Sequence, residues 1–315
     1  MLSRVAERIY WQARYLERVE NTARLLNVFS NLLLDLPGRT KLGWRALVRI
    51  TGTTELFATR YNIATESNLA QFLIADDCDA SICSMLSMAR ENARTTREVM
   101  PTEAFERIND LHYYAQSAAD SAAVRSARNE MLEHTIESAQ QIFGMLAGTM
   151  SRDSGYTFVR MGRALERADM VTRIVDVGAR KLFTHPGKGS VAPRFPEPYE
   201  GILWMSVLRS QSAYQMYRQH VRRRVNGEDV VRFLLQDEEF PRAAIHNLTT
   251  ISKVLSKLPK NEEVAGLVDE ARRHVMQSQV ADLIEEGLTD YIDRLQIKFA
   301  AIHNAITHTW FSPRN

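Results

Sequence analysis

The chain has 315 residues, of which 45% are hydrophobic and 25% charged, with 40 Lys and Arg against 38 Asp and Glu. This composition excludes an intrinsically disordered chain, a collagen-like repeat, a disulfide scaffold and a strongly basic nucleic-acid-binding protein. A chain of this length can bury roughly 75% of its unfolded surface, so neither a metal nor a disulfide is needed to hold the fold.

The cysteines and the short apolar runs indicate the cellular location. Cys78 and Cys83 are too few for a disulfide framework, and we interpret them as small apolar core residues in a reducing compartment. The amino-terminal stretch has no apolar run of signal-peptide length, and Leu32-Leu33-Leu34 is far short of the roughly 20 residues that cross a bilayer. We expect a bacterial cytoplasmic protein that does not bind a membrane.

Helices are predicted along the whole chain. Glycine and proline are scarce, at 14 and 9 residues, and apolar residues recur with a period near 3.6 rather than 2. We therefore predict an all-α fold, a multi-helix bundle that contains an internally duplicated Glu-Arg helix.

The duplicated helix covers residues 14–24 in its first copy and residues 163–173 in its second. Five of these positions are identical, and one acid changes from glutamate to aspartate. The matching positions are Arg14 and Arg163, Leu16 and Leu165, Glu17 and Glu166, Arg18 and Arg167, Glu20 and Asp169, and Arg24 and Arg173.

Each copy turns an acid toward the buried face of its helix. At about 100° per residue, the apolar positions of the first copy share one narrow arc, namely Val5, Ile9, Leu16 and Ala23. Glu20 lies within this arc, Glu17 and Arg24 lie at its edge, and Arg18 points away; the second copy has Asp169 within the arc and Glu166 and Arg173 beside it. Since an isolated buried carboxylate costs several kcal/mol, we expect each acid within the arc to pair with the arginine one turn onward.

Two interpretations of this duplicated motif stay open. In the first, the copies are buried ion pairs that fix helix register. In the second, the two clusters face each other across the bundle and form a polar cavity that binds an anionic, carboxylate or peptide-like ligand.

A stripe of arginines follows in residues 89–98. Arg90, Arg94 and Arg97 lie at i, i+4 and i+7 of one helical face, beside Glu91 and Asn92. They are either solvated surface charges or side chains that complete the polar site. The acids just before this segment, Asp76, Asp77 and Asp79, are typical of a helix start, because their spacing does not match a magnesium motif.

Residues 185–198 form a predicted linker between residues 1–184 and 199–315. The segment contains Pro186, Pro193, Pro196 and Pro198, which forbid a continuous helix. The two parts are either separate domains or one shared core, and we treat residues 1–315 as a single helical unit.

Turn and cap signals mark the second half. Asn226-Gly227 is a predicted turn with acids at the start of the next helix, and Pro241 suits a first helical position. The basic run at residues 218–224 is interpreted as a helix C-terminus or a protein contact, since we expect no nucleic-acid partner.

Complete catalytic motifs are missing from the sequence. The histidines include no zincin-type pair, Leu182 stands where a phosphate loop ending at residues 187–190 would need its leading glycine, and no nucleophile elbow occurs. We therefore predict no metal and no cofactor, and whether the chain is an enzyme stays open, with a non-enzyme favoured.

Four segments carry a family resemblance, namely residues 10–24, residues 89–94, residues 208–214, which contain Arg209, and Phe240-Pro241-Arg242. They resemble the bacterial alpha-E domain family, named for its helical content and Glu-Arg motif, in order and over nearly the whole chain. One departure is Phe105, where the family tends to have a tryptophan. The resemblance implies a peptide-forming system with a circularly permuted ATP-grasp ligase and often a transglutaminase-like cysteine protease.

The resemblance and the residues together lead to two functional hypotheses. In the first, the protein is a non-catalytic helical partner that presents a peptide or holds the ligase. In the second, it is an enzyme subunit for amide-bond formation or transfer, with Glu17 or Glu166 as a general base of raised pKa and Arg24, Arg90 or Arg173 neutralising an acyl phosphate or carboxylate.

Overall fold

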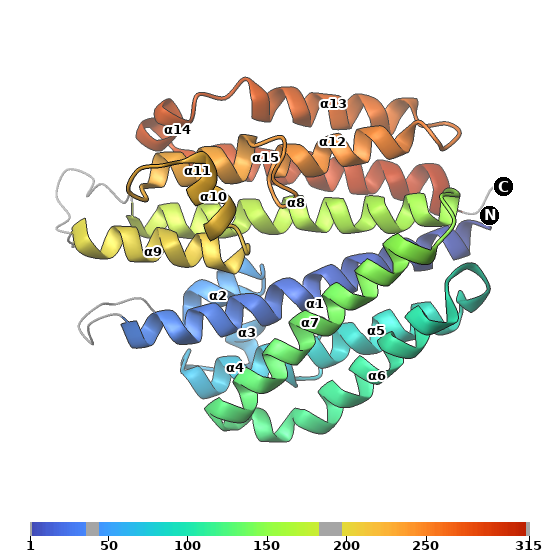
Figure 1. Ribbon diagram of the computed structural model, residues 1–315, viewed down its shortest axis with the longest axis horizontal. Helices are drawn as coiled ribbons and strands as arrows, with labels where there is room; N and C mark the ends of the chain where they lie inside the picture. The colour runs from blue at the N-terminus through green and yellow to red at the C-terminus, as the bar shows by residue number, and fades with distance from the viewer. Residues whose placement is uncertain (1, 36–43, 183–196, 313–315) are drawn as a thin grey trace.

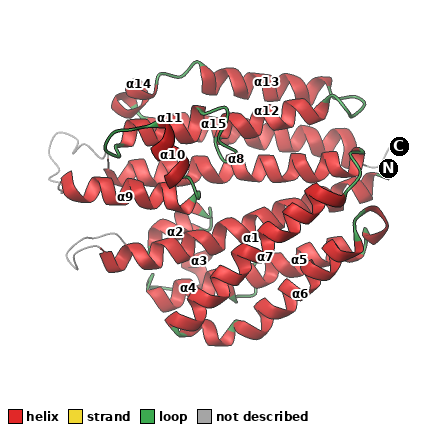
Figure 2. Ribbon diagram, in the orientation of Figure 1, coloured by secondary structure: helices red, strands yellow, loops and turns green. Residues whose placement is uncertain are grey.

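The computed structural model describes residues 2–35, 44–182 and 197–312, and within these ranges it contains helices and no strands (Figure 2). The all-α prediction is confirmed. The first half contains α1 (Ser3–Asp35), α2 (Arg45–Ile50), α3 (Thr54–Arg60), α4 (Glu66–Ile74), α5 (Ile82–Arg94), α6 (Thr102–Ala118), α7 (Arg125–Thr149) and α8 (Ser154–Leu182). The second half contains α9 (Glu197–Ser210), α10 (Tyr214–His220), α11 (Gly227–Gln236), α12 (Ala244–Leu255), α13 (Glu262–Met276), α14 (Val280–Glu286) and α15 (Leu288–Ile306).

The two long helices that carry the duplicated motif, α1 and α8, pack against each other in the middle of the molecule (Figure 1). On one side, α5 and α7 pack on α1, and α6 packs on both of them. On the other side, α12 and α15 pack on α8, and α13 covers them. Each copy of the motif is therefore enclosed by neighbouring helices rather than lying on the outside of the bundle.

One hydrophobic cluster contains buried residues from both sides of residues 183–196. Leu16 of α1 and Leu165 of α8 belong to it together with Ile251 of α12 and Ile292 of α15. Burial of such side chains is the main term that stabilises a helical bundle, at about 25 cal/mol per Å² of apolar surface.

Most of the predicted linker, residues 185–198, lies outside the described residues. At its end the structure differs from the prediction, because α9 already begins at Glu197 and has Pro198 in its first turn. A proline is tolerated there since the first turn of a helix lacks intrahelical N-H bonds.

Several local predictions can be compared with the structure. Asn226 caps α11 by accepting the backbone N-H of Asp229 at 2.9 Å, which confirms that start. Asp76 to Asp79 lie in the turn ahead of α5, whose cap is Ser81. One prediction is wrong, since Pro241 lies in a turn and α12 begins only at Ala244. The basic run at residues 218–224 does contain a helix C-terminus, because α10 ends at His220 with Arg218 in its last turn, while the arginines at 222–224 lie beyond the helix.

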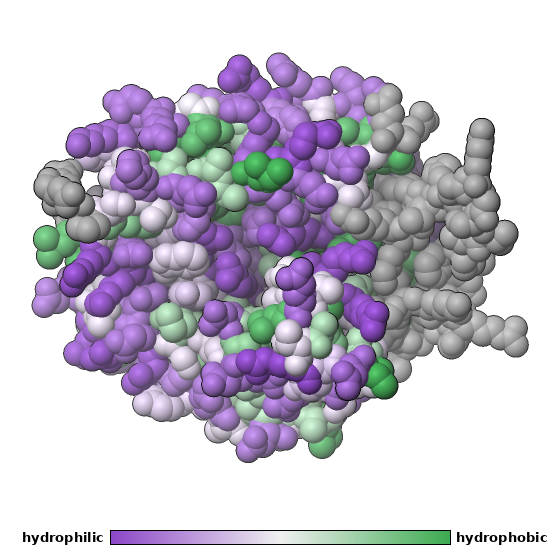
Figure 3. All heavy atoms as spheres, turned by 180° about the vertical axis from the view of Figure 1, so that it is seen from behind, coloured by the Kyte–Doolittle hydropathy of each residue, from purple (hydrophilic) through white to green (hydrophobic). Residues whose placement is uncertain are grey.

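The surface agrees with the mixed composition. The face seen from behind is mostly hydrophilic with scattered hydrophobic side chains (Figure 3). None of the helices in the described ranges is long and apolar enough to cross a membrane.

The crossing of α1 and α8 depends on a glycine. A Cβ added at Gly162 of α8 would lie 2.4 Å from the backbone carbonyl oxygen of Tyr10 in α1. A backbone atom cannot rotate away as a side chain does, so an alanine would push the two helices apart.

We expect Gly162→Ala to lower the free energy of unfolding by about 1–3 kcal/mol, the usual cost of overpacking. The matched control is Gly144→Ala in α7, where an added Cβ meets nothing within 4 Å, and where alanine should stabilise by about 0.5–1 kcal/mol. Chemical denaturation of both variants measures the difference, and equal stabilities would contradict the close crossing.

Candidate functional site: an interlocked Glu-Arg network

The second copy of the motif holds its glutamate with arginines from the first. Glu166 of α8 accepts hydrogen bonds from Arg14 Nε at 2.8 Å and from Arg18 Nε and Nη2 at 2.6 and 3.0 Å. The Arg18 pair is bidentate, the strongest geometry for a guanidinium and a carboxylate. Two arginines of α1 thus converge on one carboxylate of α8.

The first copy repeats the arrangement with the roles exchanged. Glu17 of α1 accepts from Arg163 Nε at 3.0 Å and from Arg167 Nε and Nη2 at 2.7 and 2.9 Å. Arg14, Glu17 and Arg18 match Arg163, Glu166 and Arg167 in sequence, so each copy supplies the donors for the other copy's acid. This is the pairing rule of a two-fold symmetric interface, realised here within one chain.

Both glutamates are buried and ionised. Burial alone would raise the pKa of each carboxyl, but the neighbouring guanidinium charges outweigh it. Arg18 and Arg14 lower the pKa of Glu166 from 4.5 to about 2, and Arg167 leads the charges that hold the pKa of Glu17 well below its usual range. A general base at this site would need a raised pKa. The prediction of a raised pKa at Glu17 or Glu166 is therefore wrong.

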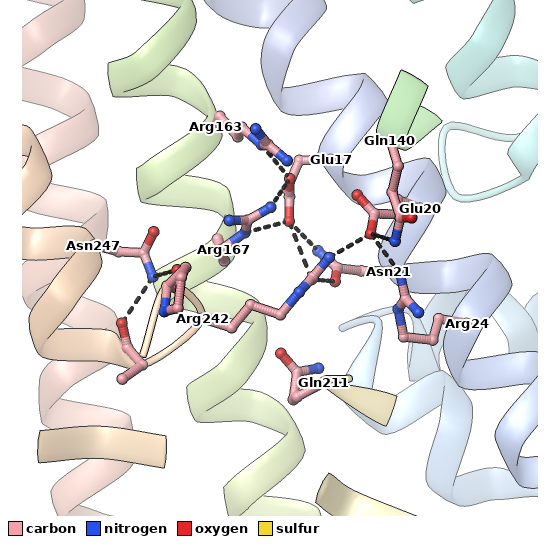
Figure 4. A network of polar contacts seen from close by, with 12 residues as sticks. Glu17, Glu20, Asn21, Arg24, Gln140, Arg163, Arg167, Gln211, Arg242 and Asn247 are labelled. Carbon is pink, nitrogen blue, oxygen red and sulfur yellow. Dashed lines mark hydrogen bonds and ion pairs between the residues drawn. The ribbon is translucent and has the colours of Figure 1, made fainter. Parts of the chain in front are cut away.

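A third arginine, from outside the motif, extends the network on the side of the first copy (Figure 4). Arg242, in the turn before α12, is buried and donates to Glu17 at 3.4 Å, to Asn21 at 3.1 Å and to Glu20. Burial, followed by the charge of Arg167, lowers the pKa of Arg242 from 12.5 to about 10. Arg242 therefore stays charged at neutral pH and ties the second half of the chain to α1.

The predicted i, i+4 pairs are also present. Arg24 donates to Glu20 at 2.5 Å and Arg173 donates to Asp169 at 2.8 Å, which confirms this pairing. The two copies differ in burial, since the Glu20 side chain is 0% exposed and that of Asp169 is 19% exposed. The first copy is sealed, whereas the second opens toward the surface.

A cluster of the buried Tyr10 and the partly buried Trp11 and His303 adjoins the network. His303 of α15 lies with its Nδ1 3.0 Å from the hydroxyl of Tyr10 and 3.2 Å from Arg14 Nη1. Trp11 packs edge-on against the same imidazole. Burial, followed by the Arg14 charge, lowers the pKa of His303 to about 4, so the ring is neutral and accepts at neutral pH.

A polar cavity of about 240 Å³ lies beside the second copy of the motif. Its walls come from α1, α8, the turn between α2 and α3, and the loop before α5, and they include Arg18, Glu166, Asp169 and Arg173. The carboxylates of both glutamates are hydrogen-bonded to guanidinium groups. The cavity is lined by residues of both copies, Arg18 and Thr22 of the first and Glu166, Asp169 and Arg173 of the second, but Glu17 and Glu20 do not line it.

Some predicted site residues lie elsewhere. Of the stripe at residues 89–98, Arg90 donates to Asn109 and Tyr113 of α6, Arg94 pairs with Glu91 on the surface, and Arg97 lies over the ring of Phe105. Asn92 belongs to the same region of α5, where its backbone carbonyl accepts from Thr95 and Thr96. Arg209 is exposed and lies over the ring of Tyr214. Arg90 and Arg97 thus contact α6 and Arg94 lies on the surface, so neither the stripe nor Arg209 takes part in the hydrogen bonds of the Glu-Arg network, in contrast to the predicted placement.

Sequence reasoning also missed members of the network. Arg18 was expected to point away, but it reaches sideways across the crossing to α8, and Arg167 does the same toward α1. The presence of an arginine at this position in both copies was the sequence signal that could have identified Arg18 and Arg167 as members of the network. Arg242 stands in the quoted Phe240-Pro241-Arg242 segment, while nothing in the sequence pattern singles out His303.

The fold and the network define a class of protein: an all-helical bundle built around two copies of a Glu-Arg helix that cross-pair their charges. The chain belongs to the Alpha-E family, described as a predicted alpha-helical domain with a conserved ER motif, whose model matches residues 1–311. The dipeptides Glu17-Arg18 and Glu166-Arg167 are the Glu-Arg sequences of this chain that take part in the interlock.

Two relatives of the chain are similar over most of its length. An uncharacterized protein of Mycobacterium bovis is 22% identical and one of Mycobacterium tuberculosis strain H37Rv is 21% identical, each over 96% of this chain. The chain spans only 35% of the length of these relatives. No solved structure matches.

Proposed function

We propose that the protein is a non-catalytic helical partner in a bacterial peptide-forming system, where it positions a substrate for a circularly permuted ATP-grasp ligase. A transglutaminase-like protease is a further partner in this proposal. The system itself comes from the family resemblance, and the residues of the network support the role within it.

The observation that carries the proposal is that arginines of the same chain hydrogen-bond the carboxylates of both glutamates. Glu17 accepts from three arginines and Glu166 from two, and both pKa values lie below the usual range. A carboxylate in that state cannot take a proton from a substrate at neutral pH. This argues against the second hypothesis, an amide-forming enzyme subunit with Glu17 or Glu166 as its base, and favours a rigid scaffold.

The lengths of the relatives support a scaffold that works together with other protein domains. Because the match covers about a third of their length, the helical unit is joined there to a long further stretch of chain. A unit of this kind, attached to or associated with other domains, is suited to holding a substrate while another component supplies the bond chemistry.

We expect the purified protein to co-elute with a circularly permuted ATP-grasp ligase of the same organism, with a Kd of about 1 μM or tighter, and to increase the ATP-dependent amide formation of that ligase. The Glu91→Gln variant, which changes only an exposed pair on α5, should behave like the parent. Separate elution with an unchanged ligase rate would refute the proposal. Amide formation by this protein alone, from an acyl phosphate and an amine, would instead support the enzyme hypothesis.

A further inference from the structure

The polar cavity beside the second copy of the motif has the features of a small ligand site. With about 240 Å³ it is smaller than the sites of about 300–1,000 Å³ that hold drug-sized molecules. Its walls bring together four parts of the chain that are distant in sequence. The lining includes the polar Arg18, Thr22, Asp79 and Arg173 and the apolar Leu56 and Met170. The occupant must therefore be small, with polar groups and an apolar part.

Two guanidinium groups in the wall are held in place by acids while remaining open to the cavity. Arg18 uses Nε and Nη2 on Glu166, and Arg173 uses Nε on Asp169. A guanidinium carries five N-H donors, so each has donors beyond these bonds. The two side chains are 31% and 30% exposed, respectively. Fixed donors of this kind suit a carboxylate and spare the ordering cost of binding.

The turn between α2 and α3 makes room for the guanidinium group of Arg173. Gly52 has φ +72°, in the left-handed region that favours glycine, and a Cβ there would lie 2.8 Å from Arg173 Nη1. On either side, the hydroxyls of Thr51 and Thr53 lie 2.7 Å apart. The Thr51 hydroxyl donates to the backbone carbonyl oxygens of Leu47 and Val48, and the Thr53 hydroxyl lies against Thr51 and the Val48 carbonyl oxygen, so this edge offers acceptors for an ammonium group.

The charges of the wall do not cancel completely. Arg18 shares Glu166 with Arg14, which lies outside the wall, and Arg173 pairs with Asp169, whereas Asp79 is exposed and forms no ion pair among the described residues. One small cavity therefore offers donors for a carboxylate and an unbalanced carboxylate for a cation. A ligand with only one of these charges would leave half of the wall unused.

We propose that this cavity binds a free α-amino acid, with its carboxylate against Arg18 and Arg173 and its ammonium group toward Asp79. The assignment deepens the proposed function by naming the substrate class. It rests on that function only for the ligand's role, which is to be the amine component delivered to the ligase.

Isothermal titration of the purified chain at pH 7 with each of the twenty common amino acids tests the site. The tightest binder is then compared with the two analogues that lack one charge, which for L-alanine are propionate and ethylamine. We expect each analogue to bind at least tenfold more weakly, because propionate lacks the ammonium group and ethylamine lacks the carboxylate that the cavity would bind. No saturable binding by any amino acid, or equal binding by an analogue, would overturn the assignment.

Matched variants locate the binding in the cavity. Arg173→Ala should weaken amino-acid binding at least tenfold, whereas Arg94→Ala, which removes another partly exposed arginine paired on its own helix, should leave it unchanged. Asp79→Asn should abolish the preference for the amino acid over its deamino analogue, with Asp77→Asn as the control outside the cavity. If a cavity variant and its control bound the amino acid with equal affinity, the ligand would bind outside this cavity.

The thermal stability of each variant identifies any loss through unfolding. These titrations contain no ligase, so failure of the partner experiment leaves them valid. Conversely, a ligase complex that forms without any amino-acid binding would overturn only the ligand assignment.

Discussion

Replacing Glu17 by glutamine will lower the free energy of unfolding by about 3–5 kcal/mol, the usual cost of removing one partner from a buried ion pair. The variant keeps the shape of the side chain but leaves Arg163 and Arg167 without their shared negative charge and Arg242 with Glu20 as its one remaining ion-pair partner among the described residues. The side chains of Arg167 and Arg242 are 11% and 9% exposed, so water cannot replace the lost partner.

Urea denaturation at pH 7 measures this effect against two other variants. Glu166→Gln should cost less than Glu17→Gln, since Glu166 pairs with two arginines and Glu17 with three. Glu91→Gln, in a pair with both side chains half exposed, should change stability by less than about 1 kcal/mol. If Glu17→Gln were no worse than Glu91→Gln, the network would not hold the bundle together.

The second large effect is a loss of stability in acid. The pKa of Glu166 is lowered from 4.5 to about 2 in the folded protein, so the unfolded chain takes up this proton first as the pH falls. Its contribution is present in full above about pH 4.5 and is lost progressively toward pH 2. A difference of this size corresponds to a contribution on the order of 3 kcal/mol, and Glu17 adds to it in the same direction.

Denaturation of the parent and of Glu166→Gln at pH 7, 5, 4 and 3 isolates this contribution. Other carboxyl groups titrate in both proteins and cancel in the comparison. We expect the gap in stability between the two proteins to narrow as the pH falls below 4.5. A gap that stays constant down to pH 3 would show that Glu166 titrates alike in the folded and unfolded states.

Much of the fold was predictable from local rules. Scarce glycine and proline and the 3.6-residue period predicted the helices, and the repeated Arg-Leu-Glu-Arg pattern predicted that α1 and α8 share a role. The pairs of Glu20 with Arg24 and of Asp169 with Arg173 followed from helical spacing alone, because both partners lie on the same helix.

The interlock itself could not be predicted from one helix at a time. A helical projection places Arg18 away from the apolar arc, but a long arginine side chain can bend around its own helix to reach a neighbour. The partner of Arg18, Glu166, is 148 residues away, and its position depends on where α1 crosses α8. That crossing is set by Gly162, whose close contact with Tyr10 appears only in three dimensions.

The direction of the glutamate pKa shifts was missed for the same reason. Burial was foreseen, and burial alone raises the pKa of a carboxyl group. The outcome depends on how many guanidinium groups converge, and Arg242 comes from a turn more than 200 residues beyond Glu17. The prediction that Arg90, Arg94 and Arg97 complete the site failed because their spacing on one helical stripe does not reveal that Arg90 and Arg97 contact α6.

The charge state of the two glutamates in the folded protein is the most direct test of the network. Carbon-detected nuclear magnetic resonance follows the side-chain carboxyl signals of Glu17 and Glu166 as the pH is lowered from 7 to 3. The interlock predicts that neither signal moves with a midpoint above pH 3. The exposed Glu91, whose pKa is lowered by the hydrogen bond from Arg94, is the comparison in solvent. A midpoint at or above 4.5 for Glu17 or Glu166 would contradict the account and restore that residue as a candidate general base.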